Sequence, residues 1–397
     1  MSQSAFFLMH NPLQHYDWGS HDAMTRLFGL PNPDAQPQAE LWMGAHPNGC
    51  SRLETPQGAI RLDDWITAAP EQALGHTTAA RFGRLPFLFK VLAAEKALSI
   101  QVHPSKQQAE AGFARENAAG VALNAAHRNY RDDNHKPELV FALTPYQAMN
   151  GFRPIPEIQA LFARVAIPAL TPLTDALAAQ PDEAGLAAFF RALLTLGGDT
   201  KIQALQELLS AAQRWRDEET FAVILSLAEQ YPGDVGLFAP LLLHVLTLQP
   251  GEAMYLDACT PHAYIRGTGL EIMANSDNVL RAGLTPKHID VDELLRCTQC
   301  RGRDAATLKL AAQREEEILH YPVPVPDFTF SVYPAGSRTL TPCSAEILFA
   351  IDAPLTLSST DGQQLTLQPG QSAFVPASTP RYQTTTAGRF ARAGNQS

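Results

Sequence analysis

The chain has 397 residues, 45% of them hydrophobic and 18% charged, which is the composition of an ordinary globular protein. This length exceeds what one hydrophobic core organises, so two or three domains are expected. A formal net charge of −10 argues against a nucleic-acid partner, because phosphate backbones bind basic faces. We find no signal peptide and no membrane-spanning run, and five cysteines without framework spacing indicate a reducing cytoplasm.

Short strand-like runs separated by Gly, Pro and Asn occupy residues 1–152 and predict a β domain with helical insertions. In the run at 85–92, Lys90 alternates onto the face of Leu88 and Leu92. A lysine on an apolar face is costly unless it is paired or used. Lys90 is therefore a candidate functional residue.

The segment 98–104 alternates apolar and polar side chains, which predicts a strand with its aliphatic residues in a core. Gln101 and His103 then emerge together on the opposite face. An amide oxygen and an imidazole side by side on a rigid strand form half of a metal site. The alternative is a polar outer face that carries a solvated histidine.

The stretch 130–138 is polar and precedes the apolar run 139–143, so it is predicted to be a loop that enters a strand. Pro137 favours extended backbone at Lys136, which should place Lys136 and Glu138 on one face. Glu138, at the mouth of the strand, is then a candidate metal ligand. Taken singly, it would be a solvated carboxylate.

A different texture, rich in Ala, Leu and Gln, predicts an all-helical domain over residues 153–235, inserted between β segments. Ile202, Leu205 and Leu208 follow helical spacing, and a capping box at Thr200 predicts the start of that helix. Nothing in this region indicates chemistry.

An internal repeat follows the helical region. Residues 246–262 align without gaps on residues 365–381, with nine of the 17 positions identical. Strand, Pro-Gly turn, strand and Thr-Pro corner are typical of a jelly-roll or cupin barrel. The last aligned position holds His262 in the first copy and Arg381 in the second, so only the first copy is predicted to hold a metal.

The predicted fold is therefore mainly β, with two cupin- or jelly-roll-like barrels and an inserted all-helical domain. Residues 1–152 and 236–325 would form one discontinuous metal-binding domain. Residues 153–235 would form the helical domain, and residues 326–397 a C-terminal jelly-roll domain without metal.

Four residues from three separated segments combine into a predicted metal site: Gln101, His103, Glu138 and His262. Such a site leaves room for water or substrate, which is the catalytic rather than the structural pattern. Two imidazoles and two oxygens suit zinc, and also manganese, cobalt or iron.

The block at 269–287 adds fixed positive charge through Arg281 and Lys287. An arginine on a short extended run can grip a phosphate or an enediolate in a bidentate way. The alternative is that both side chains form surface ion pairs.

Several motifs together resemble the type I phosphomannose isomerases. The most specific is Tyr130-x-Asp-x-Asn-His-Lys-Pro-Glu138, and the others occur in family order at 39–47, 98–104, 260–264 and 276–287. The resemblance covers nearly the whole chain, including the helical insert and a C-terminal barrel. The segment 297–304 is its most visible departure and lies outside the motifs.

The resemblance implies a zinc enzyme that interconverts mannose 6-phosphate and fructose 6-phosphate through a cis-enediol. It places one zinc ion per chain on Gln101, His103, Glu138 and His262, and the catalytic arginine on Arg281. The expected partner is a small phosphosugar. We expect a cytoplasmic monomer with neither a membrane nor a nucleic-acid partner.

Roles for the remaining site residues follow from this chemistry. We expect His135 to assist ring opening and Lys136 or Lys90 to carry the proton, with a pKa lowered by neighbouring cations and burial. Arg281 would stabilise the enediolate or hold the phosphate. Further substrate contacts are assigned to Ser99, Lys287 and Glu271.

Two other functions compete with the isomerase. A cupin oxygenase would use Fe(II) held by a His-and-carboxylate facial triad with open positions. A non-catalytic sugar-sensing barrel would not need the complete set of four ligands. The Lys- and Arg-rich surroundings favour a phosphorylated substrate and so argue for the isomerase.

Overall fold

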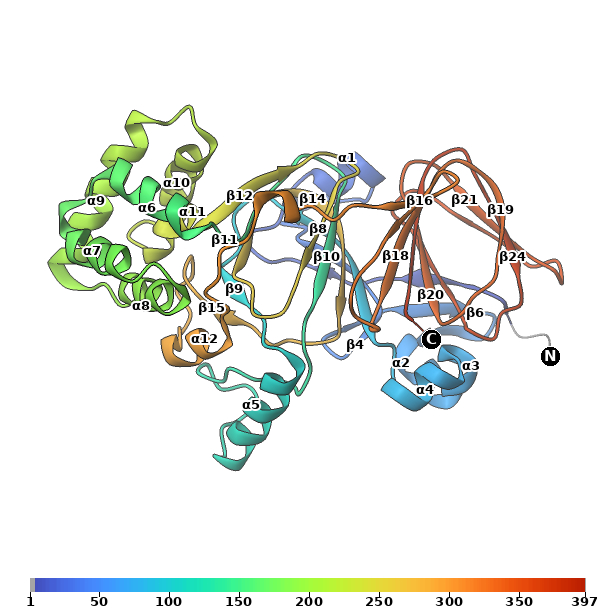
Figure 1. Ribbon diagram of the computed structural model, residues 1–397. Coiled ribbons are helices and arrows are strands. Elements are labelled where there is room, and N and C mark those ends of the chain that lie inside the picture. The colour runs from blue at the N-terminus through green and yellow to red at the C-terminus, as the bar shows by residue number, and fades with distance from the viewer. Residues whose placement is uncertain (1–3, 397) are drawn as a thin grey trace.

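The computed structural model describes residues 4–396, and Figure 1 shows an elongated molecule with helices gathered at one end and C-terminal strands at the other. Residues 1–3, where the predicted β domain begins, and residue 397 lie outside the described residues. In residues 4–396, no helix has the length and apolar character needed to cross a membrane.

The N-terminal third is built mainly from strands. Its elements are β1 (Phe7–His10), β2 (Leu13–Gln14), α1 (Ala23–Phe28), β3 (Glu40–Met43), β4 (Ala45–His46), β5 (Gly49–Cys50), β6 (Arg52–Thr55), β7 (Gly58–Arg61), α2 (Leu62–Ala68), α3 (Pro70–Leu74), α4 (His76–Phe82), β8 (Phe87–Ala94), β9 (Gln101–Val102), α5 (Lys106–Ala118), β10 (Glu138–Ala142) and β11 (Tyr146–Phe152). Helix α5 begins at a capping box formed by Ser105 and Gln108.

Helices follow, as the Ala- and Leu-rich texture predicts. They are α6 (Ile155–Val165), η1 (Pro168–Leu170), α7 (Thr171–Ala179), α8 (Glu183–Leu194), α9 (Gly198–Arg214), α10 (Glu219–Gln230), η2 (Val235–Phe238) and α11 (Ala239–Leu242). The predicted capping box at Thr200 is wrong, because α9 already begins at Gly198. Leu205 and Leu208 are buried, whereas Ile202 is 56% exposed and points away from the helical core.

Strands return in the last third. The elements are β12 (Leu243–Leu248), β13 (Ala253–Leu256), β14 (His262–Ala274), β15 (Leu280–Arg281), α12 (Val291–Cys297), η3 (Ala305–Thr307), β16 (Gln313–Glu315), β17 (Ile318–Tyr321), β18 (Thr329–Tyr333), β19 (Gly336–Leu340), β20 (Glu346–Ala350), β21 (Leu355–Ser359), β22 (Gln364–Leu367), β23 (Ser372–Val375), β24 (Tyr382–Thr386) and β25 (Phe390–Gly394).

Three large sheets and the two-stranded sheet β4–β5 build the β part of residues 4–396. The first has ten strands, six of them in the order β12-β11-β14-β8-β3-β2. Strands β9 and β10 also pair with β14, β13 pairs with β10, and β15 pairs with β9. The second has nine strands, β16-β17-β18-β25-β20-β23-β1-β6-β7, and the third has four, β19-β24-β21-β22. The fold is thus rich in sheet and carries a helical insertion, as predicted.

The predicted pair of barrels is not confirmed, because no sheet within residues 4–396 closes on itself. The N-terminal strand β1 pairs with β23 on one side and with β6 on the other. It therefore extends the C-terminal sheet with strands from the beginning of the chain. Pairing between the two ends of the chain is invisible to local sequence patterns.

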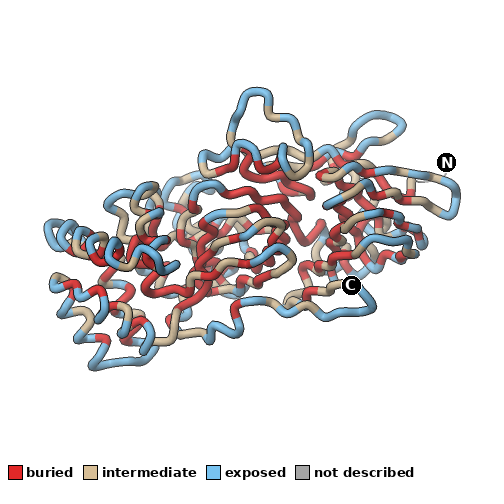
Figure 2. Tube along the Cα trace, turned by 90° about the horizontal axis from the view of Figure 1, so that it is seen from above, coloured by how far each residue is buried: buried red, intermediate tan, exposed pale blue. Residues whose placement is uncertain are grey.

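Strand β8 has a hydrophobic core on one face and a cavity on the other, which explains the alternation in its sequence. Phe87, Phe89 and Val91 belong to the core that packs against the nine-stranded sheet. Leu88, Lys90 and Leu92 face the other way, as the alternation predicts, and line a cavity. Figure 2 shows the buried segments running through the middle of the molecule, with exposed turns around them.

The internal repeat corresponds to two equivalent runs of three strands, β12–β13–β14 and β22–β23–β24. The equivalence extends to a further strand, since β10 reads Glu-Leu-Val-Phe-Ala and β20 reads Glu-Ile-Leu-Phe-Ala. Glu138 lies opposite Leu256, and Glu346 lies opposite Val375, which aligns with Leu256 in the repeat. Glu346 is therefore the C-terminal counterpart of Glu138.

Candidate metal centre and substrate cavity

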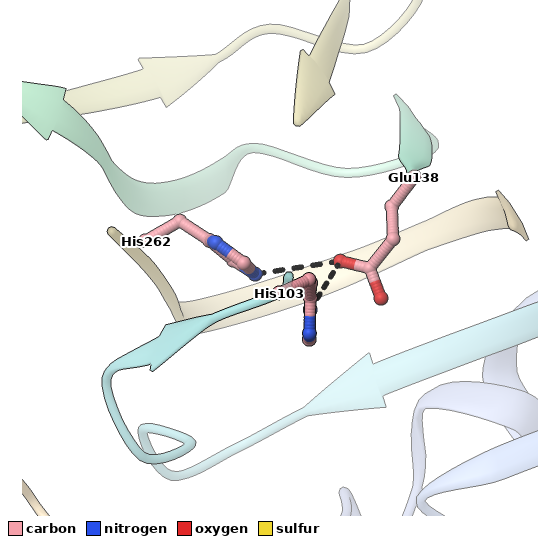
Figure 3. Close-up of side chains that lie close together, drawn as sticks. All are labelled: His103, Glu138 and His262. Atoms are coloured by element: carbon pink, nitrogen blue, oxygen red, sulfur yellow. Dashed lines mark ion pairs between the residues drawn. The ribbon is translucent and has the colours of Figure 1, made fainter. Parts of the chain in front are cut away.

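Three predicted ligands converge where three strands begin or end. His103 directly follows β9, Glu138 begins β10 and His262 begins β14. Their ligand atoms all lie within 4.8 Å of one another, and all three residues are buried. The Glu138 Oε2 atom is 3.5 Å from His103 Nε2 and 3.4 Å from His262 Nε2, as the dashed lines in Figure 3 show.

The hydrogen bonds behind both imidazoles fix which nitrogen is free. His103 Nδ1 donates to the Asn278 carbonyl at 2.8 Å, and His262 Nδ1 donates to the Thr260 carbonyl at 3.0 Å. Both Nε2 atoms then carry lone pairs and face a carboxylate oxygen. His103 Nε2 is buried without a hydrogen-bond partner among the described residues.

The two Nε2 atoms and the Glu138 carboxylate oxygen face one another without a proton between them, so their lone pairs repel unless a cation binds among them. The protonation states agree with this requirement. Burial and the charge of Lys136 lower the pKa of His103 to about 4, so its ring is neutral at pH 7. Burial opposes ionisation of Glu138, but the charge of Lys136 is the largest opposing cause, and the pKa of this carboxyl lies well below its usual value. Neutral histidines and an ionised carboxylate are what a metal ion binds.

The fourth predicted ligand, Gln101, lies beside this group. It pairs across the sheet with His262 and with Arg281, and it lines the same cavity as both. Its amide nitrogen donates to the Ser99 hydroxyl at 3.3 Å, which leaves the amide oxygen as its metal-binding atom. The donor set of two imidazoles, a carboxylate and an amide fits zinc.

A cavity of about 820 Å³ opens above the metal ligands and gathers most of the predicted site residues. Those that line it are Lys90, Ser99, Gln101, Lys136, Glu138, His262, Glu271, Arg281 and Lys287. His103, which is buried beneath the cavity, and His135 are not among the lining residues. The His135 Nε2 atom lies 3.0 Å from Asp327 Oδ2, on a segment that leads into the C-terminal strands.

A row of charged side chains crosses the cavity wall on neighbouring strands. Lys90 Nζ lies 3.0 Å from Glu271 Oε2 and 3.7 Å from Glu40 Oε1, and all three side chains are buried. Burial alone would lower the pKa of Lys90, but the carboxylates of Glu271, Glu40 and Glu138 outweigh it and raise the pKa. Lys90 is thus a fixed cation, contrary to the lowered pKa predicted for a lysine base.

A second group of charges is entirely positive. Arg281, Lys287 and Arg131 line the cavity, and within residues 4–396 none of them forms an ion pair with a carboxylate. Burial and the charge of Arg131 lower the pKa of Arg281. Burial and the charges of Arg281 and Arg131 lower the pKa of Lys287. Uncompensated cations in a cavity provide a place for an anionic group.

Sequence reasoning missed several residues that the structure brings to this cavity. Arg131 occupies a variable position of the long motif and carried no signal of its own. Glu40 and Tyr264 lie inside motifs that drew attention without a role for these positions. Tyr264 donates its hydroxyl to Glu271 Oε1 at 2.7 Å. Membership of a motif was the only signal that could have found either residue.

Comparison with known families matches three separate regions of the chain. Residues 6–155 match "Phosphomannose isomerase type I, catalytic domain", and residues 170–243 match the helical insertion domain of the same family. Residues 317–395 match "Mannose-6-phosphate isomerase, cupin domain". The matched regions follow one another in the order expected from the resemblance.

Similar proteins cover nearly the whole chain. A relative from Escherichia coli, named mannose-6-phosphate isomerase, is 48% identical over 97% of this chain and 98% of its own. A human relative of the same name is 37% identical over 95% of each chain. A crystal structure of mannose 6-phosphate isomerase from Salmonella typhimurium, bound to substrate (F6P) and zinc, superimposes with a TM-score of 0.95 at 45% identity, covering 99% of this chain and 100% of its own. The chain therefore belongs to the type I phosphomannose isomerase family.

Proposed function

We propose that this protein is a zinc-dependent aldose–ketose isomerase that interconverts mannose 6-phosphate and fructose 6-phosphate. The observation that carries the proposal is the convergence of two imidazole nitrogens and one carboxylate oxygen beside a cavity lined by cations that form no ion pair within residues 4–396. Relatives that match nearly the full chain bear the name of this enzyme, which supports the same conclusion.

The metal would be held by His103, Glu138, His262 and Gln101, with one zinc ion per chain. Zinc, when bound, supplies a Lewis acid that polarises substrate oxygens. The two isomers differ by a proton that leaves C2 and arrives at C1 through a cis-enediol, so a side chain must hold that proton between the two carbons.

Lys136 is the better candidate for this proton carrier. Its Nζ atom lies 3.0 Å from Glu138 Oε1 and the side chain lines the cavity beside the metal ligands. Lys90, the alternative, is held between Glu271 and Glu40 with a raised pKa. A lysine that keeps its proton so firmly stabilises negative charge and serves poorly as a base.

Ring opening has less support at His135. The imidazole of His135 pairs with Asp327 and does not line the cavity. It would therefore not contact a sugar bound above the metal ligands. Phosphate binding has firmer support. Arg281 and Lys287 line the cavity as unpaired cations, and the Ser99 hydroxyl lies on the same wall.

The C-terminal region is proposed to hold no metal, with an arginine taking the place of the cation. Glu346, the counterpart of Glu138, is 3% exposed. It accepts hydrogen bonds from the Arg392 guanidinium and, at 2.7 Å, from the Tyr382 hydroxyl. Its negative charge is thus already neutralised inside the fold. The predicted limits of this domain, 326–397, and of the other domains remain proposals. The derivation of both β regions from one barrel-like unit is also a proposal, and the equivalent pairing of β10 with β13 and of β20 with β23 supports it.

The location and assembly state are also proposals. All five cysteines are free, and the thiols of Cys50 and Cys343 reach the surface, which supports a reducing cytoplasm. A monomer without nucleic-acid affinity remains the expectation, and light scattering of the purified protein tests the monomer.

The decisive experiment measures metal content and mannose 6-phosphate isomerisation together, before and after chelation, with single-metal add-back. We expect one zinc ion per chain, loss of turnover on chelation and recovery with zinc. Glu138→Gln should lose both metal and turnover, whereas the exposed control Glu110→Gln should keep both. Stoichiometric metal without isomerisation would favour a different cupin chemistry, and isomerisation after verified metal removal would overturn the mechanism.

A further inference from the structure

The motif at 39–47 contains a buried histidine that the proposed function leaves unused. His46 lies in β4, which forms a short hairpin with β5. Its ring packs edge-on against Trp42, with centroids 5.1 Å apart, and its side chain is only 6% exposed. A buried polar ring of this kind requires hydrogen-bond partners.

The partners of His46 fix the position of its proton. The backbone N–H of Asn48 donates to His46 Nδ1 at 3.1 Å, so this nitrogen is an acceptor. The neutral ring therefore carries its proton on Nε2. That nitrogen lies 3.2 Å from Asp277 Oδ1 and donates to it.

The same hairpin also reaches the other oxygen of Asp277. The Asn48 side-chain amide donates to Asp277 Oδ2 at 3.2 Å. Behind the side chain, the backbone N–H of Asp277 donates to Asp132 Oδ2 at 2.7 Å. The carboxylate of Asp277 is thus gripped at both oxygens while its backbone is anchored independently.

The contacts of His46 and Asn48 with the Asp277 carboxylate are called the clamp from here on. Within this clamp, Asp277 faces the substrate cavity. Its side chain is 37% exposed and lines the cavity above the metal ligands. Asn48 and Asp277 also line an adjoining cavity of about 540 Å³, so the hydrogen bond between them belongs to the partition between the two spaces. Loss of the clamp would let the carboxylate turn and would open that partition.

The carboxylate is held in its ionised form. Burial opposes ionisation, but the hydrogen bond with His46, followed by the charges of Lys136 and Lys90, lowers the pKa of Asp277. An ionised carboxylate only accepts hydrogen bonds. The donors that a phosphosugar offers are its hydroxyl groups, because its phosphate is repelled by a carboxylate and attracted to Arg281 and Lys287.

We propose that Asp277 receives a sugar hydroxyl and that His46 and Asn48 are positioning residues that hold its carboxylate toward the cavity. This inference rests on the proposed function and deepens it. It assigns a role to the β4–β5 hairpin, in which one donor from the ring of His46 and one from the amide of Asn48 set the orientation of a substrate-binding group.

Three variants separate positioning from packing. His46→Phe keeps a ring against Trp42 and removes the Nε2 donor. His46→Gln restores an N–H donor on a side chain of similar reach. The matched control is His76→Phe, because His76 also pairs with a carboxylate, Glu71, at 3.2 Å, but both side chains are largely exposed.

The measurements are steady-state kinetics, zinc content and calorimetric binding of a linear hexitol 6-phosphate, which carries the hydroxyls and phosphate but cannot isomerise. For His46→Phe we expect KM and the hexitol phosphate Kd to rise about tenfold, the value of one well-placed hydrogen bond. Zinc content should stay at the wild-type level. His46→Gln should recover most of the loss, and His76→Phe should match the wild type.

Three results would overturn the inference. They are wild-type binding and kinetics in His46→Phe, a His46→Gln variant as impaired as His46→Phe, and an impairment accompanied by loss of zinc. Failure of the proposed function can be distinguished from failure of this inference. If the wild-type protein had no isomerase turnover, binding of the hexitol phosphate to the wild type and to the His46 variants would still measure the effect of the clamp.

Discussion

Replacing Arg392 with methionine tests whether a guanidinium takes the place of a metal ion in the C-terminal region. Arg392 donates to Glu346, to the Tyr333 hydroxyl at 2.9 Å and to the Thr341 carbonyl at 3.1 Å. Methionine fills a similar volume without charge. Glu346 would then keep the Tyr382 hydroxyl as its hydrogen-bond donor and lose its counter-ion.

The size of the effect follows from burial. The side chains of Glu346 and Arg392 are 4% and 21% exposed, so the pair is well shielded from water. Removing one partner of a buried pair leaves an uncompensated charge, which costs about 3–5 kcal/mol of unfolding free energy. Because Arg392 reaches the surface in part, we expect about 3 kcal/mol, at the lower end of that range. The double variant with Glu346→Gln removes the stranded charge and should regain more than half of the loss.

Urea unfolding, followed together with amide exchange of β20 and β25, measures the change locally as well as globally. The control is Arg389→Met, because Arg389 and Asp352 form a pair whose side chains are 39% and 42% exposed. Such a pair contributes only about 0–1 kcal/mol. An Arg392→Met protein as stable as the control, or a double variant as unstable as the single one, would refute the reasoning.

Three further outcomes are expected. Lys90→Met leaves the buried carboxylates around it without a counter-ion, so the free energy of unfolding in denaturant titrations should fall by about 3–5 kcal/mol. Lys106→Met, at the exposed pair with Glu110, should lower it by less than about 1 kcal/mol. Equal losses in the two variants would contradict the buried network. In the chelated protein, the pKa of His103 is about 4 when folded and rises on unfolding, so the unfolded state binds more protons. Stability should therefore fall by about 3 kcal/mol as the pH drops from roughly 6.5 to 4, and a chelated His103→Gln protein should have a flatter stability profile over that range. Tyr264→Phe removes the hydroxyl that donates to Glu271 at 2.7 Å, and kcat should fall about tenfold at unchanged zinc content; unaltered kcat would exclude a role for this contact.

Local patterns were sufficient to place the metal ligands. Extended backbone before Pro137 predicted that Lys136 and Glu138 share a face, and both side chains line the cavity. The strand predicted over 98–104 is only partly right, because β9 covers Gln101–Val102 alone and Leu98 lines the cavity beside Ser99 and Gln101. The resulting group of His103, Glu138 and His262 is found in the structure. His135, next to Lys136 in the chain, contacts Asp327 and does not line the cavity.

The charge states of the cavity were harder to predict. A lysine base seemed to require cationic neighbours, yet Lys90 lies opposite Glu271 on β14 and beside Glu40 on β3. Carboxylates from two distant segments therefore decide its pKa. Their distance from Lys90 depends on strand order, which no local window of the sequence contains.

The sequence by itself determined the strand and helix textures, the repeat, the ligand residues and the family, because these depend on short patterns and on the identity of side chains. Only the tertiary structure decided which segments became partners. It joined β1 to β23, Arg392 to Glu346 and the His46 hairpin to Asp277. These contacts link residues far apart in the chain, and they follow from the pairing of whole strands and the burial of their faces, which is a property of the complete fold.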